Sequence, residues 1–269
     1  MPVALVTGAS RGIGRATALA LAEAGFDVGL LARSRDALEE TRELAVARGV
    51  GAACAAVDVT DRDAVERAVA EVQQELGRPV EALVNNAGSM RAIGPLWEVD
   101  PAEWWMDVDT SLGGAFALCR AVVPGMIERR AGRIVNVVSY AAVRPAPFQS
   151  GYAAGKAAVA SLTEALAASL DEHSVRAFSV APGFTRSEMT RHLTESEEGR
   201  RWFPEAGSSR VVEAEDSAKL IVALVSGAAD ELSGRLLHTL DDLERLLGSI
   251  EEIRRDDLYA LRLRRLPGL

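Results

Sequence analysis

Tyr152 and Lys156 are four residues apart, and Ser139 lies thirteen residues before Tyr152. In a helix, residues four apart share one face, so the phenol and the ammonium group are held side by side. At about 4 Å and an effective dielectric near 20, a neighbouring cation contributes on the order of 4 kcal/mol. That energy is enough to lower the pKa of a tyrosine from about 10 towards 7. The spacing therefore predicts that Tyr152 is a general acid or base near neutral pH.

Ser139 directly follows an apolar run, residues 133–138, which predicts a buried strand. A hydroxyl at the carboxyl end of that strand could donate to a substrate carbonyl oxygen while Tyr152 delivers or removes the proton. A tyrosine four residues before a lysine also occurs by chance in many helices, where the lysine is solvated over a half-buried tyrosine. The other motifs of the chain decide between these readings.

A short apolar run, residues 2–7, leads directly into Gly8, Gly12 and Gly14, and a helical pattern follows. This order predicts a strand, a tight turn and a helix. Glycines let the backbone approach a pyrophosphate, whose charge then lies at the positive end of the helix. A plain turn between a strand and a helix is the alternative for this motif on its own.

Arg33 follows a second apolar run, residues 26–32, about twenty positions after the glycine turn. An acidic residue at this place would bind the ribose hydroxyls of NAD. A guanidinium group instead bonds a 2'-phosphate through two N–H groups, and Arg11 could add a second cation. The position favours NADP(H) over NAD(H), with a plain surface arginine as the alternative.

Apolar runs and helical patterns alternate along the chain. Strands are expected at 2–7, 26–32, 52–57, 79–84, 133–138, 175–181 and 235–240, and helices at 36–48, 61–76, 101–130, 152–170 and 214–226. This alternation predicts an α/β fold, a parallel sheet with helices on both faces. Ligands bind such sheets at the carboxyl ends of the strands, where Asp58, Asn85 and Asn86 follow their strands.

Residues 184–210 leave this pattern, because they carry many charges around Trp202 and Phe203. A segment of this length predicts an irregular cover over a substrate, with a disordered surface loop as the alternative. His192 lies within it and could touch the substrate.

The tail has a pattern of its own. Residues 241–254 have the apolar spacing of an amphipathic helix, which Asp241 or Asp242 could cap. The run 258–266 alternates apolar and other residues, which predicts a half-exposed strand paired with a sheet edge or another subunit. We therefore expect a nucleotide-binding and catalytic domain over 1–240 and a C-terminal extension over 241–269.

Composition restricts the class of protein. The chain has 269 residues, 48% of them hydrophobic, enough for one sizeable core. A formal charge of −9 argues against a nucleic-acid partner. Cys54 and Cys119 lack neighbours at ligand spacing, so no metal site is expected. No run of about 18 apolar residues suggests a membrane span, and we expect a cytoplasmic protein.

Five motifs in order resemble the short-chain dehydrogenase/reductase family, and the similarity extends from residue 1 to about 240. These motifs are Thr7-Gly8-x-x-x-Gly12-x-Gly14, Asn85-Asn86-Ala87-Gly88, Ser139, Tyr152-x-x-x-Lys156, and Pro182-Gly183 with Thr185. The resemblance implies a Rossmann-type, doubly wound sheet of seven parallel strands in three α/β/α layers. It also implies a nicotinamide cofactor and a homodimer or homotetramer.

The resemblance also assigns the site. Ser139, Tyr152 and Lys156 would be catalytic, with Lys156 also binding the nicotinamide ribose. Asp58 and Val59 would flank the adenine. The residues expected to bind the cofactor are Gly8, Ser10, Arg11, Gly12, Ile13, Gly14, Arg33, Ser34, Asp58, Val59, Asn85, Ala87, Gly88, Tyr152, Lys156, Pro182, Gly183 and Thr185.

Two departures from the family pattern are visible. Ser111 stands where family members usually carry an asparagine that holds a water of a proton relay, and a hydroxyl lacks the paired donor and acceptor of an amide. The chain also continues beyond the seventh strand, where the family commonly ends soon after Asp-Gly-Gly. The sequence therefore does not decide whether Ser111 replaces the asparagine of the proton relay, or whether the protein is a dimer or a tetramer.

The motifs favour an NADPH-dependent reductase of the carbonyl or 3-oxoacyl kind, acting on a small-molecule ketone. Oxidation of the corresponding alcohol uses the same residues. The alternative is a lyase, an isomerase or a nucleotide-binding regulator without net redox turnover. Trp104, Trp105 and Trp202 could line a pocket for a bulky apolar substrate or belong to the core.

Overall fold

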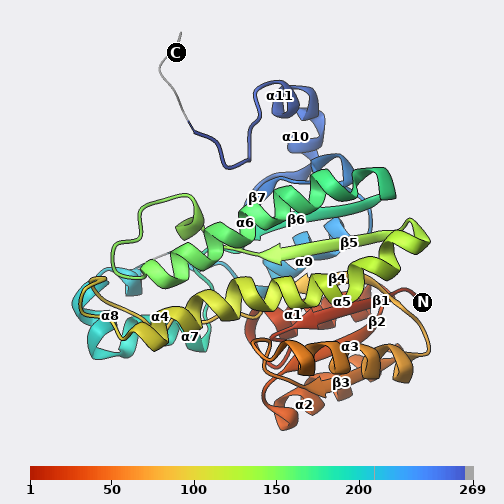
Figure 1. Cartoon of the computed structure of the whole chain (residues 1–269), viewed down its shortest axis with the longest axis horizontal. Coiled ribbons are helices and arrows are strands. Elements are labelled where there is room, and N and C mark those ends of the chain that lie inside the picture. Colours follow the sequence, from red (N-terminus) through yellow and green to blue (C-terminus); the bar gives the residue numbers. More distant parts are fainter. Residues whose placement is uncertain (209, 264–269) are drawn as a thin grey trace.

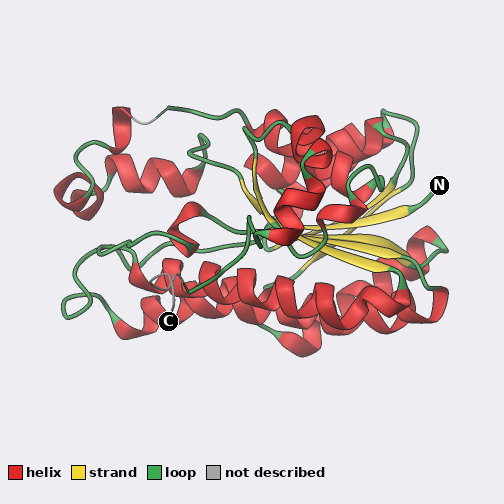
Figure 2. Cartoon of the chain, turned by 90° about the horizontal axis from the view of Figure 1, so that it is seen from above, coloured by secondary structure: helices red, strands yellow, loops and turns green. Residues whose placement is uncertain are grey.

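The computed structural model describes residues 1–208 and 210–263, and its centre is one sheet of seven parallel strands (Figure 1). The strand order is β3-β2-β1-β4-β5-β6-β7. The strands are β1 (Val3–Thr7), β2 (Asp27–Ala32), β3 (Ala52–Ala56), β4 (Val80–Asn85), β5 (Gly132–Val137), β6 (Val175–Ala181) and β7 (Leu236–His238). Figure 2 shows helices on both faces of the sheet. The predicted three-layer Rossmann-type fold is confirmed.

Both faces of the sheet are buried, which explains why its strands are almost continuous apolar runs. Every residue of β1 is buried. Ala4 and Val6 join a core cluster on one face, and Val3 and Leu5 join the cluster on the other. The strand order reverses between β1 and β4, and ligands of open α/β sheets bind at the carboxyl edge next to such a reversal.

The helices divide between the two faces. The first core cluster contains residues of α1 (Gly12–Glu23), α2 (Arg35–Val46) and α9 (Ala214–Val225). The second contains residues of α3 (Arg62–Leu76), α5 (Gly114–Arg129) and the end of α6 (Ser150–Leu170). Ser34 and Asp61 cap α2 and α3 by accepting bonds from backbone N–H groups, which fixes where these helices begin.

The helix expected over 101–130 contains a local irregularity. It comprises α4 (Pro101–Val108), a π-helical turn over Asp109–Gly113, and α5. Contrary to the sequence reading, Pro101–Arg129 has the length and hydropathy of a membrane-spanning helix. Core helices share that composition, and Leu118, Val122 and Met126 of α5 are buried in the second core cluster.

Residues 184–210 are more regular than predicted. They form α7 (Glu188–Glu195) and α8 (Glu197–Trp202), and Ser187 and Ser196 cap the two helices. The helices are short and each buries a single residue, so charged side chains dominate the sequence and hide their periodicity. Figure 1 places α7 and α8 with α4 at one end of the molecule.

Two predictions for the tail were wrong. The single helix is divided into α10 (Leu243–Gly248), capped by Asp242, and α11 (Ile250–Arg255), because the helix stops at Gly248 and Ser249. Residues 258–263 form no strand, since Tyr259 has a positive φ of 59° that interrupts an extended chain. Residues 264–266 of the predicted strand lie outside the described residues.

Candidate active site

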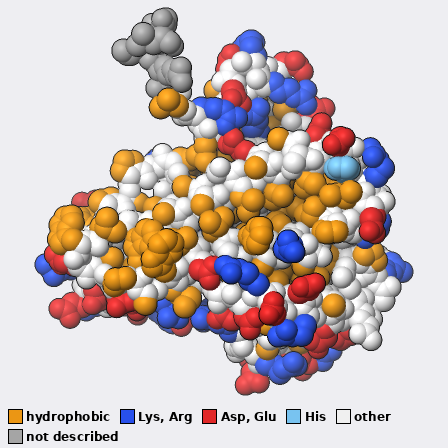
Figure 3. Space-filling model, in the orientation of Figure 1, with side chains coloured by type: hydrophobic (Ala, Val, Ile, Leu, Met, Phe, Trp, Pro, Cys, Tyr) orange, Lys and Arg blue, Asp and Glu red, His pale blue; other side chains and the backbone are white. Residues whose placement is uncertain are grey.

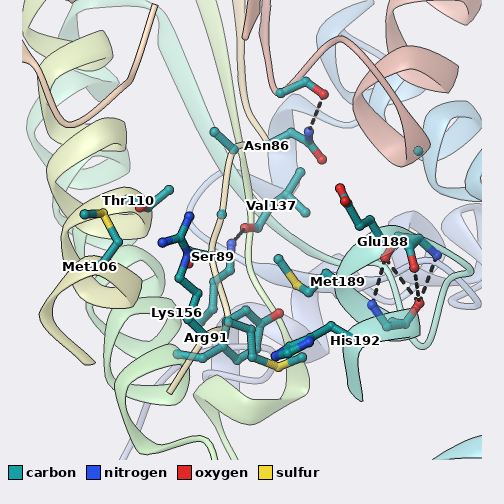
Figure 4. A pocket seen from close by; sticks show the side chains of 18 of the residues that line it. Asn86, Ser89, Arg91, Met106, Thr110, Val137, Lys156, Glu188, Met189 and His192 are labelled. Atoms are coloured by element: carbon teal, nitrogen blue, oxygen red, sulfur yellow. Dashed lines mark hydrogen bonds between the residues drawn. The ribbon is translucent and has the colours of Figure 1, made fainter. Parts of the chain in front are cut away.

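A cleft of about 1000 Å³ opens at the carboxyl edge of the sheet (Figure 4). The loops after β1 to β6 line it, together with side chains of α4, α6 and α7. It brings together sixteen of the predicted site residues: Gly8, Ser10, Arg11, Gly12, Ile13, Arg33, Ser34, Asp58, Val59, Ala87, Gly88, Tyr152, Lys156, Pro182, Gly183 and Thr185.

Two predicted cofactor residues lie outside the lining of the cleft. A Cβ on Gly14 would lie 2.1 Å from the Gly8 carbonyl oxygen, so Gly14 lets α1 pack against the turn. The Asn85 amide points into the interior, where it donates to Asn136 Oδ1 at 2.8 Å. Asn86 lines the cleft instead and donates to the Thr7 carbonyl at 2.9 Å. The motif contained both asparagines, and spacing alone did not show which one faces the cleft.

The loops after β1 and β4 are tied together at the point where the strand order reverses. Thr7 Oγ1 accepts the backbone N–H of Asn86 at 2.9 Å and that of Ala87 at 3.0 Å. Gly8 and Gly12 have positive φ values of 64° and 53°, which other residues rarely adopt. The glycine turn is therefore held open next to the N-terminus of α1, as binding of a phosphate group requires.

Three arginines, Arg11, Arg33 and Arg91, line the cleft. Arg33 and Ser34 line it directly after β2, with Asp58 nearby after β3. Burial by itself raises the pKa of Asp58, but hydrogen bonds from Thr60 and the charges of Arg33 and Arg91 hold it below its ordinary value. Arg11 forms an ion pair with Glu188 of α7, so this predicted second cation already has a partner across the cleft.

Lys156 is buried, with 4% of its surface exposed. Its Nζ donates to the Val137 carbonyl oxygen at 2.7 Å and lies 5.7 Å from the centroid of the Tyr152 ring. Burial lowers the pKa of Lys156 to about 8. The strand end of β5 thus fixes the ammonium group at the floor of the cleft (Figure 4).

The pKa of Tyr152 differs in direction from the prediction. Burial raises it, a hydrogen bond with Ser139 lowers it, and the charge of Asp107 raises it further. The cost of burying a phenolate outweighs the stabilising contacts, so the structure favours the protonated phenol. Ser139 itself lies outside the cleft lining, and its Oγ also accepts the N–H of Ala141 at 3.2 Å.

The residues of the cleft fit a dinucleotide. Thr185 lines the cleft with 4% of its surface exposed, yet its hydroxyl has no hydrogen-bond partner among the described residues. Such a buried group is rare unless a ligand completes it. A Cβ on Gly88 would lie 3.2 Å from Lys156 Nζ, so glycine keeps the lysine end of the cleft clear. Within residues 1–208 and 210–263, no group of three potential metal ligands is found.

Ser111 occupies the π-helical turn between α4 and α5. It is 3% exposed, and its hydroxyl has no partner within the described chain. Its Cβ lies 3.2 Å from the point where a Cβ on Gly155 would stand, directly before Lys156. The residue therefore faces the lysine helix, as its place in the sequence suggested.

An apolar cluster lies beside Tyr152 in the cleft. Tyr152, Phe184 and Met189 pack against a cluster of Met90, Ile93 and Leu193. His192 also lines the cleft, as expected for a residue that could touch the substrate. Sequence reasoning missed the methionines, because isolated methionines carry no positional signal.

The tryptophans have separate places. Trp202 packs on Phe148, with ring centroids 4.6 Å apart, and lines a smaller hollow of about 150 Å³. Trp104 donates from Nε1 to Ser150 Oγ at 3.0 Å, which joins α4 to α6. Trp105 is 64% exposed, so the predicted pocket of three tryptophans is not formed.

Comparisons with known proteins agree with this geometry. A family model described as short chain dehydrogenase matches residues 2–198. The 3-oxoacyl-(acyl-carrier-protein) reductase FabG of Pseudomonas aeruginosa is 37% identical over 232 residues, which cover 86% of this chain and 93% of that protein. An NAD+-bound xylitol dehydrogenase has a TM-score of 0.80 at 30% identity and covers 88% of this chain and 96% of its own. Actinorhodin polyketide ketoreductase with NADPH has a TM-score of 0.79 at 31% identity, with 88% and 94% covered.

Proposed function

Since the chain belongs to the short-chain dehydrogenase family, an oxidoreductase family that uses nicotinamide cofactors, we propose that it is an NADPH-dependent carbonyl reductase. Bound dihydronicotinamide supplies a hydride to the carbonyl carbon. Tyr152 gives the hydroxyl proton to the carbonyl oxygen, and Ser139 supports that oxygen with a hydrogen bond. Lys156 binds the nicotinamide ribose and stabilises the phenolate that remains.

One observation carries this proposal: Tyr152, Lys156, the glycine turn and Thr185 line the same cleft, and the Thr185 hydroxyl has no hydrogen-bond partner among the residues that the structure describes. The raised pKa of Tyr152 supports reduction, because the protonated phenol is the form that donates. Apolar side chains around Tyr152 support a small ketone with a hydrophobic substituent as the substrate.

The preference for NADP(H) rests on Arg33. Related structures contain either cofactor, so the choice depends on this chain's own residues. The two residues that line the cleft directly after β2 are Arg33 and Ser34, neither of which would repel a 2'-phosphate. We expect Arg33→Asp to weaken NADPH binding by roughly tenfold to a hundredfold and to leave NADH binding nearly unchanged. Fluorescence titration of both dinucleotides measures this, and equal losses for the two would contradict it.

Tyr152→Phe tests the reaction. NADPH consumption is followed across a panel of ketones, with NADH beside it. The variant should lose turnover by roughly a thousandfold or more while NADPH binding stays within about twofold. A fully active variant would refute the role of Tyr152. If the wild-type protein binds NADPH and reduces no ketone, the non-redox alternative replaces this proposal.

We also propose a cytoplasmic homo-oligomer, a dimer or a tetramer. Figure 3 shows hydrophobic side chains gathered on one face of the molecule, and Trp105 of α4 and Phe116 of α5 are 64% and 48% exposed. Contiguous exposed apolar surface is typical of subunit contacts. Light scattering coupled to size-exclusion chromatography measures the assembly.

A further inference from the structure

Asp107, in the last turn of α4, is a fully buried carboxylate. Within the described residues, four hydrogen bonds reach it, and neutral donors supply all of them. Ser89 Oγ donates at 2.6 Å, the Arg91 N–H reaches both oxygens at 2.9 and 3.0 Å, and the Ala92 N–H donates at 3.1 Å. A buried charge without a cationic partner is costly, so its retention calls for a reason in the architecture of the site.

All three donors belong to the loop that follows β4, and this loop is a wall of the cleft. Ser89, Arg91 and Ala92 line the cleft, as does Met90. Met90 packs in the same cluster as Tyr152 and Met189. The carboxylate therefore fixes, from α4, the loop that faces the proposed substrate position.

Close packing of α4 on α6 brings Asp107 to Tyr152. A Cβ on Gly151 would lie 2.9 Å from the Trp104 carbonyl oxygen, and one on Gly155 would lie 3.3 Å from the Asp107 carbonyl oxygen. These glycines flank Tyr152 along α6. The charge of Asp107 adds to burial in raising the pKa of Tyr152.

Other charged or titratable groups share this environment. Those that line the cleft with Tyr152, from its own helix, from the loop after β4, and from α4, α7 and α8, are Lys156, Arg91, Glu98, Asp100, Glu103, Glu188, His192 and Glu198. Asp107 is fully buried and Lys156 is 4% exposed, so water screens these two charges less than those of the other groups.

We propose that Asp107 is a positioning residue of the reductase: it holds the loop Ser89–Ala92 as the wall of the substrate site and keeps a fixed negative charge beside Tyr152. This inference rests on the proposed function. The charge disfavours the phenolate and thereby widens the pH range in which Tyr152 is a proton donor.

Asp107→Asn tests both roles of Asp107, holding the loop Ser89–Ala92 and keeping a negative charge beside Tyr152. The amide has one acceptor oxygen, so its NH2 group replaces an oxygen that now accepts from the loop, and the Ser89 hydroxyl must turn from donor to acceptor or the Arg91 N–H must face the NH2 group. We expect kcat/KM for the ketone to fall about tenfold, mostly through KM. The descending limb of the pH profile of kcat should move to lower pH by about one unit, since the charge beside Tyr152 is gone.

Asp107→Glu and Asp109→Asn are the controls. The glutamate keeps the charge but changes the distance between the carboxylate and the donors of the loop. We therefore expect the descending limb of its kcat pH profile to stay in place while KM for the ketone rises. Asp109, two residues later, is partly exposed and pairs with Arg62, and its asparagine variant should match the wild type. An Asp107→Asn protein with an unchanged pH limb and unchanged KM would overturn the proposal.

A readout without turnover separates this proposal from the proposed function. The chain has three tyrosines, so ultraviolet titration against Tyr152→Phe isolates the Tyr152 phenolate. In the Asp107→Asn protein it should form at lower pH, whether or not a ketone is reduced. If Asp107→Asn fails to fold, KM for the ketone is measured for Asp107→Glu and for Ser89→Ala, which removes one donor to the carboxylate. A raised KM in these variants supports the positioning role. Unchanged KM in both would count against the positioning role.

Discussion

Thr185 and Thr17 are both buried threonines whose hydroxyls lack a hydrogen-bond partner within the described chain, yet only Thr185 lines the cleft. An unpaired buried hydroxyl costs about 1–3 kcal/mol. Thr17 lies in α1 with its side chain in the core, so its cost is uncompensated. A ligand in the cleft can supply a hydrogen-bond partner to Thr185 but not to Thr17. Comparing the two threonines therefore tests whether the Thr185 hydroxyl binds the ligand.

Thr185→Val should weaken NADPH binding several-fold and leave the free protein as stable as the wild type, or more stable by about 1 kcal/mol. Thr17→Val should give the same gain in stability with no change in NADPH affinity. Thermal unfolding and fluorescence titration of both variants measure the two effects. Equal NADPH affinity in wild type and Thr185→Val would show that the hydroxyl does not meet the cofactor.

At the scale of residues, the sequence predicted which residues lie in the cleft better than it predicted the direction of their pKa shifts. Tyr152 and Lys156 were found from their spacing, and the structure places both in one cleft. The direction of the Tyr152 pKa depended on burial and on Asp107, and neither can be seen from the spacing. In the sequence, Asp107 is one more acidic residue in a helix, which usually means a solvated face.

The contact between α4 and α6 sets the geometry of the site at the scale of elements. Gly151 and Gly155 are one turn apart on α6 and meet the backbone of α4, and Gly155 also meets the Ser111 side chain of the π-helical turn. Trp104 closes this contact through its bond to Ser150. The glycines therefore set the distance between the helix that carries Tyr152 and the helix that carries Asp107.

Gly151→Ala should lower the free energy of unfolding by about 1–3 kcal/mol, because its methyl group would overlap the Trp104 carbonyl and ring. Gly125 in α5 is the matched control, since only the flexible end of Arg129 lies near it. Gly125→Ala should be neutral or stabilising by up to about 1 kcal/mol. Urea unfolding measures the free energy of unfolding of both variants. Similar free energies would show that α4 moves away from α6 at little cost.

Elements differed in how well the sequence predicted them. The seven strands were found because both of their faces are buried and their apolar runs are almost unbroken. The helices α7 and α8 were missed because eight and six residues with one buried position each leave too little periodicity. The tail strand was predicted from alternation alone, although alternation does not exclude the positive φ at Tyr259.

At the scale of the whole molecule, the tail is joined to the main core. Leu246 of α10 and Ile253 of α11 are buried in the same cluster as α1 and α9. Beyond them, the Leu236 N–H of β7 donates to the Tyr259 carbonyl at 2.8 Å, and the Leu261 N–H donates to Glu164 of α6 at 2.7 Å. The described tail thus covers the edge of the sheet at β7, which otherwise offers unpaired backbone groups.

Leu246→Ala tests whether the C-terminal extension over 241–269 packs on the domain over 1–240, one of the two packings expected from the sequence, or unfolds as a separate unit. If the tail shares the core, the variant should lower the free energy of unfolding of the whole chain by about 2–4 kcal/mol in one transition. Leu240→Ala is the control, because Leu240 is 48% exposed and the substitution should cost well under about 1 kcal/mol.

Tryptophan fluorescence reports the unfolding of the main domain, since all four tryptophans precede residue 240, and circular dichroism reports the unfolding of all helices. Coincident transitions that move together mean that the tail belongs to the core, whereas a fluorescence transition that Leu246→Ala leaves in place means that residues 241–269 unfold on their own.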